Sequence, residues 1–207
     1  MIIRRIILVT ILFFSFSEFF GQTQTVPPNC YVNFEEFKQN KPSLRFEFQL
    51  KKRDGEDVFM MGGIRNYRLK KIKPEASKDK VLKWAWGVIL DDTIYINSYP
   101  YSKIIGFNEI LEKGYYSYFI GDPARGEKEQ RALGIIKETD KWETRVWGMM
   151  GYVILTDGTI KMLRPELLTE LCKDNAELLK EIKEAKLTIE NVELMFKYLK
   201  RYNSTKK

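Results

Sequence analysis

The chain has 207 residues, of which 44% are apolar and 30% charged, and its formal net charge is +7 at pH 7. That length and apolar fraction suit one folded domain with a sizeable core. The sequence holds no histidine, which excludes Ser-His-Asp and Cys-His catalysis and the imidazole ligands of most zinc and copper sites. Acid–base chemistry would have to come from carboxylates, Lys or Tyr, and we predict no catalytic residue, cofactor or metal ligand.

The first 21 residues have the layout of a secretory signal peptide. Arg4 and Arg5 form a basic start, an unbroken apolar run covers residues 6–14, and small residues follow. The run is too short to span a bilayer, which takes about 20 apolar residues. We expect cleavage after Gly21, or alternatively after Ser17, and an exported protein of the periplasm, cell surface or extracellular space without a transmembrane segment in its mature chain. The expected regions are a signal peptide (1–21), a short tether (22–29), one globular domain (30–203) and a tail (204–207).

The first part of the domain predicts a short helix followed by two strands. Asn33 and Glu36 have the spacing of a capping box, which opens a helix. Apolar and polar residues then alternate over 44–51, as is typical of a strand with one buried face. A turn at Asp54-Gly55 and a second strand over 67–72 follow.

The middle of the chain predicts a run of short antiparallel strands. A strand expected over 82–90 places Trp84 and Trp86 in the core, and a turn at Asp91-Asp92 joins it to a strand over 93–97. Asp157-Gly158, between two apolar runs, is the strongest hairpin signal in the chain. Further strands are expected at 102–107, 115–120, 132–137 and 146–155.

After Leu163 the apolar period changes from that of a strand to that of a helix. Pro165 marks a helix start, Asp174 or Asn175 can cap a second helix, and Thr188 can cap a third. Strands first and helices last predict an α+β fold. We expect an antiparallel β meander, curled into a roll or partly closed barrel, with a short N-terminal helix and two to three C-terminal helices.

The two cysteines, Cys30 and Cys172, allow two interpretations. In an exported chain the pair is compatible with one disulfide that closes most of the domain into a loop. Alternatively, Cys172 is a buried free thiol, since it follows Leu171 in an apolar helical stripe. The sequence leaves both open.

Positive charge is concentrated between Lys51 and Lys83, where eleven basic residues face five acidic ones. A surface of this kind attracts polyanions, which for an exported protein would be an anionic envelope glycan or lipopolysaccharide rather than nucleic acid. The alternative is a solvated edge strand, whose Lys residues discourage aggregation. The candidate ligand-binding residues of this stretch are Lys51, Lys52, Arg53, Arg65, Arg68, Lys70, Lys71 and Lys73.

Three smaller features have both a functional and a structural interpretation. Tyr99 and Tyr101 flank a proline in a predicted loop tip, where exposed rings could stack on sugars, although half-buried strands also favour aromatic residues. Arg125 lies in a glycine-bounded loop, a usual place for binding residues. The run Asp54–Asp57 offers oxygen ligands for Ca²⁺, although a plain polar turn explains it better.

Six short motifs of packing and turn residues carry a resemblance: Trp86-Gly87-Val88, Ile94-Tyr95-Ile96-Asn97, Asp174-Asn175, Leu178-Leu179, Tyr198-Leu199 and Tyr202-Asn203. They are similar to motifs in uncharacterised exported proteins of Bacteroidota, a family without an assigned function. The resemblance covers most of the chain beyond residue 21. It implies a Gram-negative envelope location, and it implies no activity and no catalytic residue.

The sequence therefore favours a non-enzymatic binding or interaction module of the cell envelope, whose ligand is an anionic glycan or lipid or a protein partner. Two alternatives stay open. One is a hydrolase of envelope polymers that uses carboxylate or Lys/Tyr chemistry. The other is an accessory subunit of a secretion or surface complex.

Overall fold

The computed structural model describes residues 27–60, 64–124, 126–136 and 149–206. The predicted signal peptide with its expected cleavage sites, most of the predicted tether, and Arg125 lie outside these ranges. The strands are β1 (Cys30–Tyr31), β2 (Glu47–Lys52), β3 (Tyr67–Lys73), β4 (Gly87–Leu90), β5 (Thr93–Asn97), β6 (Phe107–Glu112), β7 (Ser117–Gly121), β8 (Met150–Ile154) and β9 (Ile160–Met162). The helices are α2 (Phe34–Lys38), α3 (Gly55–Met60), α4 (Lys78–Trp84), α5 (Tyr99–Ser102), α6 (Glu127–Ala132), α7 (Pro165–Leu171), α8 (Ala176–Glu184) and α9 (Val192–Ser204), with a 3-10 turn η1 (Glu75–Ser77).

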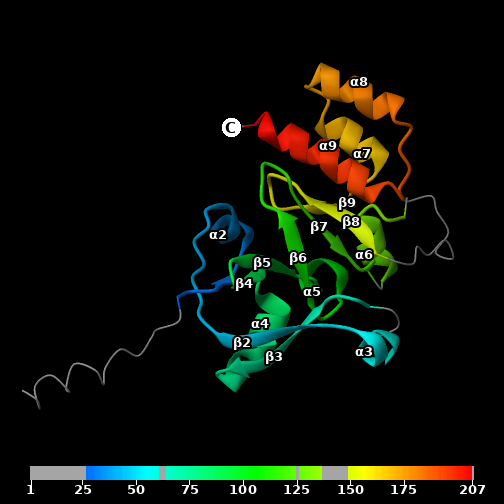
Figure 1. The fold of residues 1–207 in the computed structure, drawn as a ribbon. Helices are drawn as coiled ribbons and strands as arrows, with labels where there is room; N and C mark the ends of the chain where they lie inside the picture. Colours follow the sequence, from blue (N-terminus) through cyan, green and yellow to red (C-terminus); the bar gives the residue numbers. More distant parts are fainter. Residues whose placement is uncertain (1–26, 61–63, 125, 137–148, 207) are drawn as a thin grey trace, which may run out of the picture.

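The strands form one curled antiparallel sheet, which confirms the predicted α+β fold with a meander at its centre. The order along the sheet is β1-β4-β5-β6-β7-β8-β9, and β2 and β3 branch off as a separate ladder. β3 joins the main sheet through one residue pair, Tyr67 opposite Phe107. In Figure 1, α7, α8 and α9 lie together at one end of the curl, and β2, β3 and α4 lie at the other.

Both predicted hairpins are confirmed. Asp91 and Asp92 have φ of 48° and 60°, which is the backbone of a type I′ turn, and they join β4 to β5 in register. Gly158 has φ of 86° in the turn between β8 and β9, and the Asp157 carboxylate accepts the backbone N–H of Thr159 at 2.8 Å. Short polar residues that tolerate positive φ therefore set the register of the meander.

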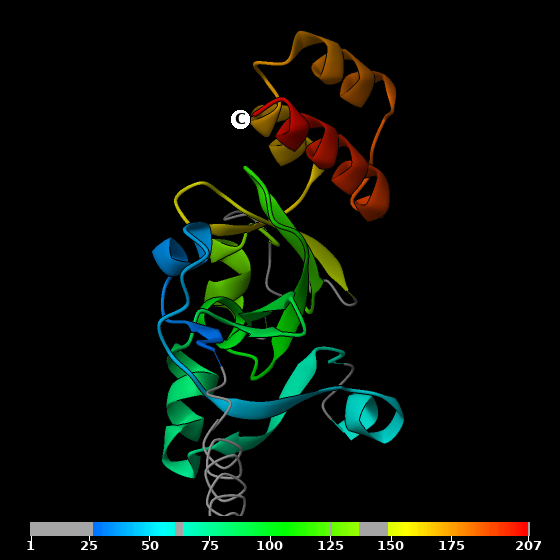
Figure 2. The ribbon, with the colours of Figure 1, turned by 60° about the vertical axis from the view of Figure 1, so that its left-hand side comes forward.

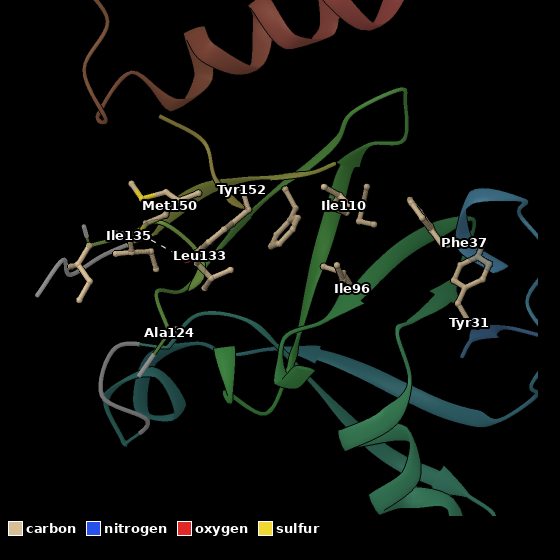
Figure 3. Packing of buried hydrophobic residues seen from close by; sticks show 13 residues of the cluster. Tyr31, Phe37, Ile96, Ile110, Ala124, Leu133, Ile135, Met150 and Tyr152 are labelled. Carbon is tan, nitrogen blue, oxygen red and sulfur yellow. Dashed lines mark hydrogen bonds between the residues drawn. The ribbon is translucent and has the colours of Figure 1, made fainter. Parts of the chain in front are cut away.

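Three hydrophobic clusters fill the molecule. The first lies in the curl of the sheet, and Figure 3 shows it running from Tyr31 and Phe37 past Ile96 and Ile110 to Tyr152 and Met150. The second packs α7, α8 and α9 against β7 and β8, and the third lies under β2, β3 and α4. The clusters hold the roll, the helical cap and the β2–β3 ladder in one body.

Three of the four predicted helix starts are confirmed. The Asn33 side chain accepts the backbone N–H of Glu36 at 3.0 Å, which starts α2. Asn175 caps α8 by accepting the N–H of Leu178 at 3.0 Å, and Pro165 is the first residue of α7. The third C-terminal helix begins after Asn191 rather than at Thr188, because residues 188–191 form a turn in which Asn191 Oδ1 accepts the N–H of Thr188.

The strand predicted over 82–90 is wrong in its first half. Residues 78–84 form α4, and Trp84, expected in the core, is 75% exposed. The buried carboxamide of Asn97 donates to the carbonyls of Leu82 at 3.1 Å and Ala85 at 2.8 Å, and so ends the helix. Only Trp86 packs against the core, stacked on Phe37 at 4.3 Å.

Three further local predictions are wrong. The turn at Asp54-Gly55 continues into α3, and the strand predicted at 102–107 is replaced by α5 and a loop before β6. The strand predicted over 132–137 is the end of α6 followed by a turn, with residue 137 outside the described ranges. In each case a helix of four to six residues occupies a stretch too short to show a helical period.

The disulfide interpretation is also wrong, because Cys30 and Cys172 are both free, buried thiols. Cys30 belongs to the third hydrophobic cluster and Cys172 to the second, at opposite ends of the molecule. Cys172 packs with Leu168 and Leu178, as the alternative interpretation expected.

Candidate functional site

The predicted basic surface lies on β2, α3 and β3, which we call the basic arm (residues 47–60 and 64–73). β2 and β3 pair with Leu50 opposite Leu69 and Lys51 opposite Arg68. Because side chains alternate between the faces of a strand, the two leucines pack on the third cluster and the two cations lie on the opposite, outer face. In Figures 1 and 2 the arm extends from the roll with α3 at its far end.

A buried polar joint connects the arm to the roll. Arg53, only 9% exposed, donates from Nε to Asn66 Oδ1 at 2.9 Å and from Nη2 to the carbonyl of Ile105 at 3.3 Å. The carboxylate of Asp122, next to β7, accepts the backbone N–H of Arg65 at 3.0 Å. Arg53 was predicted to contact a ligand, but it is positioned to anchor the arm.

The electrostatics of this joint centre on Asp122. Burial raises the pKa of its carboxyl above the ordinary value, although backbone hydrogen bonds from Arg65 and Asn66 and the nearby charge of Arg53 act in the opposite direction. Desolvation is the larger of these effects. The joint is therefore held by a carboxylate that ionises less readily than an exposed one.

The joint also requires glycine at position 106. A Cβ there would lie 2.2 Å from Asn66 Nδ2, and Gly106 has φ of 154°. Asn66 is 2% exposed, and its Nδ2 has no hydrogen-bond partner in the part of the chain that the structure describes. The backbone at Gly106 therefore packs closely on Asn66, and the buried Nδ2 donor of Asn66 is left without a described acceptor.

Acidic neighbours neutralise part of the outer face of the arm. Its ion pairs are Arg68–Asp57 (2.6 Å), Lys73–Glu47 (3.5 Å) and Lys51–Asp54 (4.0 Å). The carboxylate of Asp57 therefore pairs with the guanidinium of Arg68. Across the described ranges, no group of three or more acidic or cysteine residues is placed to hold a metal ion.

Four cations of the arm remain exposed without an ion pair to a described residue: Lys52, Arg65, Lys70 and Lys71. Lys71 has φ of 53°, at a bulge where the register of β2 and β3 shifts. Lys52 Nζ lies 6.0 Å from the centre of the Tyr67 ring. Over residues 47–73 eight basic residues oppose four acidic ones, so the arm carries +4 of the net +7 of the chain.

Tyr99 and Tyr101 do not form the predicted loop tip, because both lie in α5. The Tyr101 hydroxyl accepts from Asn108 Nδ2 at 2.9 Å, and its ring lies 5.8 Å from that of Phe119. Tyr99 is half-buried, with Lys103 Nζ 5.4 Å from its ring centre. The structure places Tyr101 against the core and away from the arm.

Two tyrosines with raised pKa values, Tyr101 and Tyr152, are hydrogen-bonded inside the protein. Tyr152 donates to the backbone carbonyl of Asp122 at 3.1 Å, and burial raises the pKa of Tyr152 and of Tyr101. Both phenols are therefore neutral hydrogen-bonding groups at neutral pH.

The sequence-based predictions do not include two large apolar side chains that the structure exposes. Phe59 and Met60, at the end of α3, are 82% and 72% exposed. Trp84 lies beside an apolar recess of about 20 Å³ lined by Cys30, Phe46 and Val81, which is the size of a single water site. The run Val58-Phe59-Met60 was a usable signal, since it carries no alternation and lies between a turn and a glycine pair.

A model of a family of unknown function, DUF6563, matches residues 29–206. The chain belongs to this family. The match covers almost all of the described structure and agrees with the expectation of an uncharacterised family. No curated protein matches the chain, and no solved structure does. None of the helices in the described ranges is long and apolar enough to cross a bilayer.

Proposed function

We propose that this DUF6563 protein is an exported envelope protein of a Bacteroidota bacterium and a non-enzymatic binding module for an anionic glycan or lipid. The layout of residues 1–21 supports export, and the motif resemblance supports the bacterial envelope. The observation that carries the binding role is the basic arm. Lys70 and Lys71 lie exposed, without an ion pair to any described residue, on an arm with an excess charge of +4.

The physical basis is the attraction of phosphate, sulfate or carboxylate groups to cations that no neighbouring acid neutralises. Lys70 and Lys71 lie one after the other at the bulge, between Arg68 and Lys73, whose acidic partners are Asp57 and Glu47. Exposed charges attract over a distance set by ionic strength, so binding of this kind weakens as salt rises.

The test compares two double variants with the same change in charge. Lys70→Glu/Lys71→Glu reverses the unpaired charges of the arm. Lys183→Glu/Lys197→Glu reverses two exposed lysines on α8 and α9, which make no ion pair to a described residue. Binding of heparin and of lipopolysaccharide is measured by calorimetry at about 50 and about 200 mM salt.

We expect the arm variant to weaken binding about tenfold or more at low salt and to reduce the salt dependence. The control variant should bind within about twofold of the wild type, apart from the effect of net charge. Equal losses in the two variants would show that binding follows total charge and not the arm. No binding by the wild type at either salt concentration would overturn the proposal.

A further inference from the structure

Two adjacent apolar side chains project from the far end of the basic arm. Phe59 and Met60 are 82% and 72% exposed, and Figures 1 and 2 show α3 away from the roll. Single exposed apolar residues are common, but large ones next to each other at the tip of a protruding element mark a contact with an apolar phase or partner.

The orientation of this tip is fixed from inside the arm. In the first turn of α3, Asp57 pairs with Arg68 of β3 at 2.6 Å, with both side chains about a quarter exposed. Val58 is half-buried, and its N–H donates to the carbonyl of Asp54 at 3.3 Å. With this side of the helix held against the strands, Phe59 and Met60 point outward.

The charges around the tip define its partner. Lys52 and Arg65 lie at the base of α3 and form no ion pair in the described structure, whereas the acids Asp54 and Asp57 are paired with cations of the strands. Glu56 is the one acid of α3 without such a pair in the described residues. A soluble glycan would satisfy the cations and leave the apolar pair in water. A bilayer surface with anionic headgroups offers both environments side by side.

We propose that the basic arm docks on an anionic lipid surface, with Phe59 and Met60 entering the interface between the headgroups and the acyl chains. Lys52 and Arg65 then lie at headgroup level, and Lys70 and Lys71 add attraction farther along the arm. This inference rests on the proposed binding function and narrows its ligand to a lipid surface.

The experiment measures sedimentation of the protein with vesicles of phosphatidylglycerol and phosphatidylcholine, and with vesicles of phosphatidylcholine alone. Phe59→Ser/Met60→Ser removes the apolar tip without changing charge. Ile189→Ser/Leu194→Ser is the matched control, since both residues are exposed apolar side chains on the helical cap. Thermal unfolding shows whether each variant is folded. Heparin binding shows whether the exposed cations of the arm still bind a polyanion.

We expect the wild type and the control to bind the anionic vesicles, and the tip variant to bind them at least about tenfold more weakly with heparin binding unchanged. A Phe59→Trp variant should gain blue-shifted fluorescence on vesicle binding, beyond any change of the four native tryptophans. This second variant tests insertion without removing the apolar tip.

Four outcomes would overturn the inference. If the tip variant binds vesicles as the wild type does while Lys70→Glu/Lys71→Glu does not, adsorption is electrostatic only and the proposed function stands. If heparin or lipopolysaccharide binds and phosphatidylglycerol vesicles do not, the ligand is a glycan. If the wild type forms a dimer that the tip variant abolishes, the tip contacts a second copy. Absence of every kind of binding overturns the proposed function as well.

Discussion

At the scale of single residues, the joint of the arm depends on a few buried polar groups. Asp122 accepts the N–H of Arg65, while Arg53 connects Asn66 to the carbonyl of Ile105. A buried carboxylate is costly to ionise, and the raised pKa of Asp122 records that cost. The joint therefore makes a defined contribution to the pH dependence of stability.

The Asp122→Asn variant tests this contribution. Between the ordinary carboxyl pKa of 3.8 and the raised folded value, the folded state holds more protons than the unfolded state. The free energy of unfolding of the wild type therefore falls as pH rises through that window. The variant cannot titrate at this position. The free energy of unfolding of the wild type minus that of the variant should therefore fall as pH rises and then level off. Urea unfolding from about pH 3.5 to about pH 7 measures it; a difference that rises with pH would contradict the assignment.

At the scale of elements, the side chain of Asn203 hydrogen-bonds α9 to the β6–β7 turn. Asn203 accepts the backbone N–H of Tyr116 at 2.9 Å and donates to the carbonyl of the same residue at 2.8 Å, as a neighbouring strand would. A Cβ on Gly114 would lie 2.5 Å from Asn203 Nδ2, so glycine allows the close approach. This pair of bonds supplements the apolar contacts of the second cluster.

Replacing Asn203 with alanine should lower the free energy of unfolding by about 2 kcal/mol, because both backbone groups of Tyr116 lose a protein partner. Ser204→Ala, one residue along at an exposed position, should change it by less than about 0.5 kcal/mol. Chemical denaturation of both variants measures the difference. Similar small effects of the two substitutions would show that the cap is held by its apolar contacts alone.

Turns and helix starts can be predicted from the sequence because the residues that specify them lie next to them in the chain. The Asp91-Asp92 turn, the Asn175 cap and Pro165 at a helix start all act within four residues of the structure they specify. The end of α4 is set by Asn97, which is twelve residues from Ala85 along the chain. A sequence pattern in which Trp84 and Trp86 alternate cannot reveal that distant carboxamide.

The same distinction explains how far the candidate site could be predicted. The excess of positive charge on the arm is a property of composition, so the sequence reveals it. The burial of Arg53 comes from Ile105, fifty-two residues away, and the neutralisation of Arg68 comes from Asp57 across the arm. The exposure of Phe59 is likewise a tertiary property, since it depends on which side of α3 contacts the strands.

At the scale of the whole molecule, the two thiols lie in separate clusters that no rotation of side chains can bring together. Burial raises the pKa of Cys30 to about 12 and that of Cys172 to about 11, so both are protonated and unreactive in the folded protein. The molecule is therefore stabilised by its three hydrophobic clusters without a covalent link between them.

Alkylation with iodoacetamide followed by mass measurement checks this arrangement. The native protein should gain no adduct, because both thiols are buried and protonated. In denaturant without a reducing agent, both cysteines should be alkylated. Failure to label the unfolded, unreduced protein would show that the thiols are oxidised, contrary to the structure.

The single bridge between β3 and β6 has a mechanical consequence. Phe107 pairs with Tyr67 on one side and with Asn97 on the other, so the sheet forks at this residue and the arm shares one rung with the roll. Bending at the fork strains that residue pair and the buried polar joint formed around Arg53 and Asp122. The hydrogen bonds between β2 and β3, and those between neighbouring strands from β4 to β9, stay intact. We expect bending between arm and roll to concentrate at this fork and to be resisted by the third cluster, in which Leu50 and Leu69 pack with residues of α4 and β4, so that the arm changes its angle to a surface only slightly and without a change in the core.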